Sequence, residues 1–281
     1  NLSIVPQENS AYMNALLEAD PLANWRFNEA QTDTNVYDFI SSLTGIVGDE
    51  NSTRINIDGP RPTEFPGFAS DNSAIQFPVL VEVPTPVLNT NTVTFITWIN
   101  PTFAQLDYTG LFMTRSGTQA GLAYTTDNQL GYTWNNNSTY TWQSGLRPPD
   151  NQWSMVALVI ETNRATIYLG TGGSISAAIN TIPHTAEVWG QAARIGDDAG
   201  GANRAFNGII DEVSVFNRAL SFQELASLYG AATGVPQDLP PIISTQPVST
   251  TRFAGSTVNF KTVVASTGPV TYQWKKGSVN V

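Results

Sequence analysis

The sequence predicts an all-β fold in which antiparallel strands form a sandwich, with a short helix at each end of the main domain. From Ala74 onward, short alternating stretches follow one another with turn residues at short intervals, the pattern of such a sandwich. Hydrophobic residues make up 41% of the 281-residue chain, enough for a substantial core. Charged residues are only 13%, so the polar surface must come from Asn, Thr, Ser, Gln and Gly, as in extracellular β proteins.

The first elements are a helix and a strand. Residues 8–19 place Tyr12, Leu16 and Ala19 on one stripe, and Asp20-Pro21 stops this helix. Residues 23–29 alternate as a first strand, followed by a long loop as far as Ser73. The further predicted strands are 74–77, 93–99, 110–114, 121–124, 130–135, 139–143, 154–160, 165–169, 193–195 and 208–216. Two hairpin turns are predicted, at 136–138 and at 161–164.

The last of these strands runs directly into a helix. Ser221 and Glu224 form a capping box, which predicts a helix from Phe222 to Tyr229 that ends at Gly230. Within the strand, Asp211 and Glu212 are adjacent, and neighbouring strand residues point to opposite faces. They are therefore not expected to form the carboxylate pair of a glycosidase.

No other motif indicates catalysis. The histidine of the loop 183–185, His184, is expected on the surface, and the sequence contains no phosphate-binding loop or zinc motif. The absence of cysteine excludes disulfides, thiolate metal sites and cysteine nucleophiles. The sequence thus favours a protein that is not an enzyme.

The charge balance limits the partners. The formal net charge of −10 repels nucleic acid and anionic membranes and suits cations such as calcium. No apolar run approaches the ~18 to 20 residues of a membrane span. No apolar segment headed by Lys or Arg lies at Asn1, so we expect that any secretion signal has been removed or lies outside this sequence.

Aromatic residues around the turn 136–138 suggest a sugar-binding surface. Symmetric pairing about Asn137 sets Trp134 opposite Tyr140 and Tyr132 opposite Trp142, an aromatic ladder on one face. In a groove, the ladder would offer flat platforms for sugar rings; facing inward, it would be core, the commoner use of aromatics in strands. The polar partners expected for sugar hydroxyls are Asn135, Gln143 and Arg115.

The part that follows the main domain has a different pattern. Residues 231–241 read as a linker, and residues 242–281 resemble the first three strands of an immunoglobulin-like domain, with Trp274 in the place of its core tryptophan. Such a sandwich needs roughly 100 residues, so this one is partial. Either the chain continues in a longer protein, or a neighbouring chain supplies the missing strands, which would cause self-association.

Several strings give the main domain a family resemblance over residues 10–230. They are residues 21–29, Trp98 to Pro101, Asn151 to Trp153 and the closing segment 208–221. These resemble the laminin-G-like, concanavalin A-type jelly rolls of exported bacterial proteins. The resemblance implies a jelly roll with a lectin-like or adhesive role in a larger cell-surface protein that holds glycans. The alternative is a structural building block with no sugar site.

The same resemblance implies calcium. In related jelly rolls an acid near the N-terminus and one in the last strand hold a structural calcium, and here these are Glu29 and Asp211, with Asp38 as a third ligand. Backbone carbonyl oxygens of residues 45–48 would complete the coordination shell of the calcium ion. Alternatively, Asp211 accepts backbone N–H groups or pairs with an arginine such as Arg26 or Arg218.

A second calcium candidate is the acidic loop 197–203. Its carboxylates, Asp197 and Asp198, lie where many carbohydrate-binding relatives hold an ion on the rim. The loop lacks the fixed spacing of an EF-hand, and a solvated glycine-rich turn is the alternative.

Overall fold

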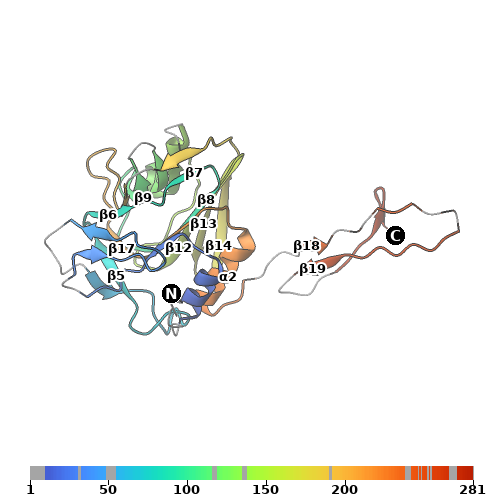
Figure 1. Ribbon diagram of the computed structural model, residues 1–281, viewed down its shortest axis with the longest axis horizontal. Helices are drawn as coiled ribbons and strands as arrows, with labels where there is room; N and C mark the ends of the chain where they lie inside the picture. The colour runs from blue at the N-terminus through green and yellow to red at the C-terminus, as the bar shows by residue number, and fades with distance from the viewer. Residues whose placement is uncertain are drawn as a thin grey trace. The chain divides into compact units, whose positions relative to one another are not determined.

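The computed structural model describes residues 10–30, 33–48, 55–115, 119–134, 138–189 and 192–237, and then 242–245, 247, 249–251, 253, 255–265 and 271–280. The chain divides into two compact units, Asn1–Val235 and Pro236–Val281. The larger unit is an antiparallel β-sandwich, as predicted, in which two sheets stack face to face (Figure 1).

Eight strands form the first sheet. The closing strand β17 (Gly208–Phe216) lies near its middle and pairs with β8 (Val93–Pro101), with β5 (Ser73–Phe77) and with the first strand β1 (Ala23–Trp25). The first and last strands are therefore neighbours. The remaining strands are β12 (Ser154–Glu161), β13 (Arg164–Thr171) and β14 (Ser174–Asn180) beyond β8, and β4 (Ile55–Asp58) beyond β5.

Seven strands form the second sheet. In spatial order they are β11 (Leu130–Thr133), β10 (Ala120–Tyr124), β9 (Gly110–Thr114), β16 (Ala192–Ile195), β6 (Val81–Pro84), β3 (Gly45–Val47) and β2 (Asn35–Val36). A separate two-stranded ribbon pairs β7 (Leu88–Thr90) with β15 (Glu187–Trp189). Two 3₁₀ turns, η2 (Thr126–Asn128) and η3 (Ser138–Thr141), flank β11.

The main core fills the space between the sheets. Phe95 of the first sheet stacks on Trp189, with ring centroids 5.0 Å apart, and lies 5.1 Å from Phe112 of the second sheet. All three rings are at most 1% exposed. Burial of aromatic rings from both sheets holds the sandwich together.

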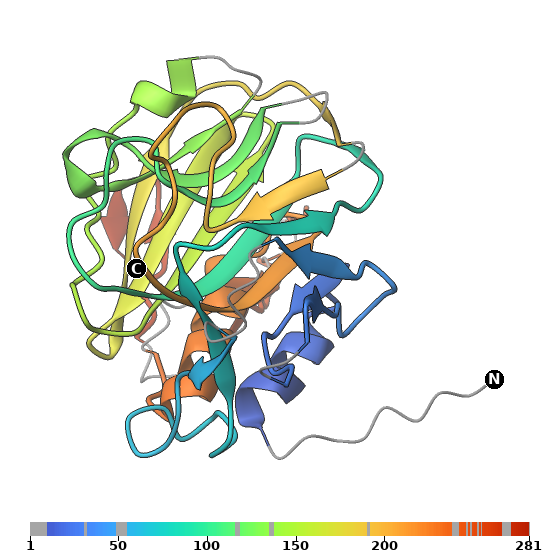
Figure 2. The same ribbon diagram turned by 90° about the vertical axis from the view of Figure 1, so that its left-hand side faces the viewer.

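A second core lies between the first sheet and the two helices, α1 (Ala11–Glu18) and α2 (Phe222–Thr233). Figure 2 shows the helices side by side. Trp98 of β8 lies at the centre of this core, with the rings of Tyr12, Phe65, Phe68 and Tyr229 all within 6.0 Å. Trp98 therefore has a structural role.

The predicted end of α2 at Gly230 is wrong. The helix begins at the capping box of Ser221 and Glu224, as predicted, but continues to Thr233. Gly234, with φ 67°, adopts the left-handed conformation that ends it. The helix passes through Gly230 because the next turn still buries Ala232 against the second core.

The smaller unit contains two short antiparallel strand pairs among its described residues. One pairs β18 (Ile242–Thr245) with β19 (Val263–Ala265), and the other pairs β20 (Lys275–Lys276) with β21 (Val279–Asn280). Trp274 contacts Phe260 at 6.2 Å but stays 41% exposed. The immunoglobulin-like interpretation, and the self-association that it suggested, stay predictions. In the part of the chain that the structure describes, no helix combines the length and apolar character of a membrane span.

Candidate functional site

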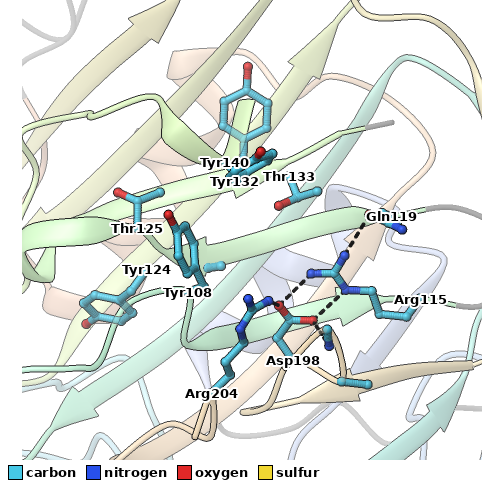
Figure 3. Close-up of a pocket in the computed structure, with 13 residues that line it drawn as sticks. Tyr108, Arg115, Gln119, Tyr124, Thr125, Tyr132, Thr133, Tyr140, Asp198 and Arg204 are labelled. Carbon is cyan, nitrogen blue, oxygen red and sulfur yellow. Dashed lines mark hydrogen bonds and ion pairs between the residues drawn. The ribbon is translucent and has the colours of Figure 1, made fainter. Parts of the chain in front are cut away.

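A pocket of about 480 Å³ opens on the outer face of the second sheet, over strands β9, β10 and β11 (Figure 3). Phe112, Leu122 and Tyr132 are cross-strand partners that face the main core. Because side chains alternate along a strand, Gly121, Ala123 and Thr133 face outward. The pocket lies over Ala123 and Thr133, whose side chains are small, whereas Met113 lies against Gly121. The lining residues are Tyr108, Arg115, Gln119, Ala123, Tyr124, Thr125, Tyr132, Thr133, Tyr140, Asp198, Ala199, Gly200 and Arg204.

Two tyrosines from different loops stand at the mouth of the pocket. The rings of Tyr108 and Tyr140 meet edge to face, with centroids 6.0 Å apart, and Tyr140 is 38% exposed. Tyr108 has φ 64°, a conformation that non-glycine residues rarely adopt and that costs about 1–3 kcal/mol. The guanidinium carbon of Arg204 lies 5.1 Å from the Tyr108 ring centroid, which supports the ring from one side.

One wall of the pocket is an Arg-Asp-Arg cluster. Arg115 holds Asp198 with two parallel bonds of 2.6 Å, from Nε to Oδ1 and from Nη2 to Oδ2. Arg204 donates from Nη1 to the same Oδ2 at 2.7 Å, and the Gly200 amide donates to Oδ1 at 2.9 Å. The Arg115 Nη1 group donates to Gln119 Oε1 at 2.9 Å. Figure 3 shows both guanidinium groups converging on the carboxylate.

This cluster fixes the charge state of Asp198. Burial raises the pKa of this carboxyl, but the hydrogen bonds from Arg115, Gly200 and Arg204 outweigh burial, so the pKa lies below its usual value. The side chain is 1% exposed and ionised at neutral pH. Two arginines and one carboxylate leave one net positive charge at the pocket wall.

The acidic loop 197–203 is held by ion pairs in this structure. Asp197 pairs with Arg194 at 2.6 Å, and each oxygen of Asp198 accepts two N–H bonds, the full capacity of a carboxylate. Calcium at Asp197 and Asp198 stays a prediction. A side chain at Gly200 would lie 2.6 Å from Arg115 Nη2, so glycine lets the loop come close to the cluster.

The predicted aromatic ladder is wrong in its geometry. β11 ends at Thr133, and the segment expected to return as a second strand forms η3, whose Thr139 hydroxyl accepts the Trp134 amide at 2.9 Å. Tyr132 and Trp142 still meet, at 5.8 Å, but Tyr140 contacts Tyr108 instead of Trp134.

The residues predicted to bind sugar therefore lie in different parts of the structure. Arg115, Tyr132 and Tyr140 line the pocket. Trp134 is buried in the main core, where its Nε1 donates to Thr185 O at 2.8 Å, and Trp142 packs against that core. Gln143 bonds to Asp127 Oδ2 and Thr126 Oγ1 on the neighbouring turn, outside the pocket lining, and Asn135 lies outside the described residues.

The expected surface position of His184 is wrong. The side chain is 4% exposed, and its Nε2 lies 2.9 Å from the Tyr132 hydroxyl, which also accepts a bond from Asn180 Nδ2 at 2.9 Å. Burial lowers the pKa of the imidazole from its ordinary value. His184 thus fixes Tyr132 behind the pocket as a neutral group.

The buried acids of β17 form a separate cluster. A β-bulge, with φ 49° at Glu212, interrupts the strand. Asp211 and Glu212 therefore do not alternate between a buried and an exposed face, and both are fully buried. Arg26 Nε donates to Glu212 at 3.0 Å, and Asp211 accepts from Asn72 at 2.7 Å and from the Glu212 amide at 2.8 Å. Burial, and then the charge of Glu212, raises the pKa of Asp211 well above its usual value.

The other predicted calcium ligands accept local amides. Asp38 bonds to the amides of Asn24, Ile40 and Ser41 and to the Ser41 hydroxyl, and Glu29 accepts the Tyr37 amide at 2.7 Å. Over the residues that the structure describes, no three acidic or histidine side chains gather as a metal site. Calcium at Glu29, Asp38 and Asp211 stays a prediction.

Tyr108 and Arg204 are two lining residues of the pocket that sequence reasoning missed. Tyr108 and Arg204 lie in loops without periodicity, and they meet only through tertiary structure. The glycine pair 200–201 was the one local signal, because glycines permit close approach of a backbone to other groups.

Comparison with solved structures shows the same fold in proteins of low sequence identity. Domain 4 of an extracellular arabinanase from Geobacillus stearothermophilus, solved in complex with arabinotriose, is 16% identical with a TM-score of 0.55; the match covers 74% of this chain and 98% of that domain. Trypanosoma rangeli sialidase in complex with sialic acid is 13% identical with a TM-score of 0.51, over 75% of this chain and 33% of the sialidase. The botulinum neurotoxin serotype G binding domain is 14% identical with a TM-score of 0.50; the match covers 75% of this chain and 50% of that domain.

The chain spans a third of the sialidase and half of the toxin domain, and at these identities the likeness shows the fold alone. No curated protein matches the sequence. A family model matches residues 79–226, just over half of the chain, from β6 into α2. The chain therefore belongs to the concanavalin A-like lectin/glucanases superfamily.

Proposed function

We propose that the larger unit is a non-catalytic carbohydrate-binding module of an extracellular protein, and that the pocket beside Tyr108 and Tyr140 is its sugar site. The observation that carries the proposal is the pair of tyrosine rings at the mouth of a polar pocket on the outer face of the sandwich. Such rings offer apolar faces to the C–H groups of a sugar, while their hydroxyls stay available for hydrogen bonds. The complex of the arabinanase domain with arabinotriose supports the choice of a saccharide.

The absence of a carboxylate pair supports a binding role. A glycosidase needs two carboxyl groups beside the scissile bond, one of which accepts or donates a proton. Among the described residues that line the pocket, Asp198 is the one carboxylate, and it is held ionised by two arginines. Asp211 and Glu212 are fully buried.

The surface composition supports an extracellular glycan partner. The chain has no cysteine and few charged residues, and the polar surface depends on Asn, Thr, Ser and Gln. The alternative, a structural building block without a sugar site, predicts that no glycan binds.

A glycan array followed by calorimetry tests the proposal with matched tyrosine variants. Tyr140→Ala removes a ring from the pocket, whereas Tyr37→Ala removes an exposed ring next to β2, at the opposite edge of the same sheet. We expect Tyr140→Ala to weaken binding about threefold to tenfold, the effect of about 0.5–1.5 kcal/mol, and Tyr37→Ala to leave binding unchanged. Failure of every glycan to bind, or equal effects of the two variants, would reject the proposal.

A further inference from the structure

Among the charged side chains of the pocket lining, the groups that remain for a ligand are donors, whereas the hydroxyls of Tyr108, Thr125, Thr133 and Tyr140 can both donate and accept. Both oxygens of Asp198 already accept two N–H bonds each, and the carbonyl oxygen of Gln119 accepts from Arg115. Asp198 therefore has no accepting capacity left, and Gln119 Oε1 keeps one lone pair. The Nη groups of Arg115 keep additional hydrogens, because a guanidinium carries five N–H donors.

Arg204 has the greatest remaining capacity. Across the described residues, its bond to Asp198 uses Nη1, and neither Nε nor Nη2 donates to another group. Its side chain is 24% exposed, and that of Arg115 is 23% exposed, so solvent and ligand can reach both. The Tyr108 ring and the turn at Gly201 hold the guanidinium of Arg204 in place.

The two guanidinium groups at this wall match an anionic group better than they match a neutral sugar hydroxyl. Each hydroxyl of a sugar both donates and accepts, so a neutral ring needs protein acceptors as well as donors. A carboxylate or sulfate accepts only, and guanidinium groups bind such planar or multidentate anions with charge-assisted bonds. The net positive charge of the cluster favours an anion locally, although the chain as a whole is negative.

We propose that the saccharide bound in this pocket carries an anionic group, a carboxylate or a sulfate ester, and that Arg115 and Arg204 bind it. This inference rests on the proposed function and specifies its ligand class. The tyrosine rings then hold the sugar ring, and the arginines select for the charge. Asp198 acts as a positioning residue, because it orients both guanidinium groups without touching the ligand.

An array of matched saccharides tests this inference. It pairs oligogalacturonates with their methyl esters, sialylated with desialylated lactosamine, and chondroitin sulfate with its desulfated and carboxyl-reduced forms. We expect binding to the acidic member of a pair and loss of about tenfold to hundredfold in affinity for the neutral member, the effect of a charge-assisted contact. The chondroitin series separates carboxylate from sulfate. Added salt is expected to weaken binding, because the contact is ionic and partly exposed.

Matched arginine variants locate the effect. Arg204→Gln is expected to remove most of the preference for acidic members, and Arg204→Lys to keep part of it. The control is Arg164→Gln, which removes one positive charge at the exposed turn between β12 and β13. Thermal unfolding of each variant checks that it is folded.

The outcomes distinguish the two proposals. Neutral members that bind as tightly as acidic ones, with binding still lost in Tyr140→Ala, would overturn the charge inference and keep the sugar site. Equal effects of Arg204→Gln and Arg164→Gln would also overturn it. A chain that binds no saccharide would reject both the anionic ligand and the proposed function.

Discussion

Replacement of Arg26 by methionine tests the role of the buried acids of β17. Arg26 is 7% exposed, and its Nε lies 3.0 Å from Glu212, whose side chain is fully buried beside Asp211. The aliphatic part of methionine can still pack on Phe39, which lies under the guanidinium at 5.3 Å. The substitution therefore removes the positive charge and leaves two carboxyl groups buried together.

The expected loss in the free energy of unfolding is about 3–5 kcal/mol, the usual cost of removing one partner of a buried ion pair. For a domain of this size, each 1 kcal/mol corresponds to roughly 2–4 °C, so the midpoint falls by about 6–20 °C. The loss depends on pH. Burial and Glu212 already raise the pKa of Asp211, and loss of Arg26 raises it further. The folded variant binds protons more readily than the unfolded chain. Its loss of unfolding free energy relative to the wild type therefore grows as pH rises and shrinks toward acid pH.

Urea unfolding at pH 5 and pH 8 measures both quantities. The double variant Arg26→Met/Glu212→Gln removes the uncompensated charge and is expected to recover more than half of the loss. The expected cost of the buried unpaired charge at pH 8 is about 3–5 kcal/mol. A free energy of unfolding for Arg26→Met within about 1 kcal/mol of the wild-type value at that pH would refute the reasoning. So would a deficit that is larger at pH 5 than at pH 8.

Three further predictions concern the core, the histidine and the metal. Trp134→Ala is expected to lower the free energy of unfolding by about 3–5 kcal/mol, because it removes a fully buried ring; a loss below about 1 kcal/mol in a denaturant titration would show that the ring is not core. Burial lowers the pKa of His184, so the free energy of unfolding of the wild type is expected to fall as pH drops below about 6.5. His184→Gln can keep a bond to Tyr132 and is expected to flatten that pH dependence. Parallel profiles of unfolding free energy against pH for the two proteins would contradict this prediction. If calcium binds at Asp211, excess chelator lowers the unfolding midpoint of the wild type but not of Asp211→Ala; an unchanged wild-type midpoint would count against the ion.

Strand alternation was sufficient to predict the sandwich and its closing strand. It failed at Glu212, because the bulge there comes from the simultaneous pairing of β17 with β8 and β1, and glutamate has no intrinsic preference for positive φ. The helix end failed for a similar reason. Burial of Ala232 against the sheet extends α2 past a glycine that would end an isolated helix.

The candidate site was predicted in part, and for an incorrect reason. Tyr140 was selected as a member of a flat aromatic ladder, and Arg115 as a polar partner beside it, but Tyr140 reaches the pocket from a 3₁₀ turn and pairs with Tyr108. Alternating aromatics look the same in sequence whether they face a groove or an interior. The position of the opposing sheet decides between the two, and for Tyr132 and Trp134 it puts both in the core.

A crystal structure of the full chain with the tightest acidic saccharide from the array tests the central claim most directly. The account predicts a sugar ring against Tyr108 and Tyr140, with its anionic group within hydrogen-bond distance of Arg115 or Arg204. A saccharide bound elsewhere on the sandwich, with the pocket of Figure 3 unchanged, would contradict the account.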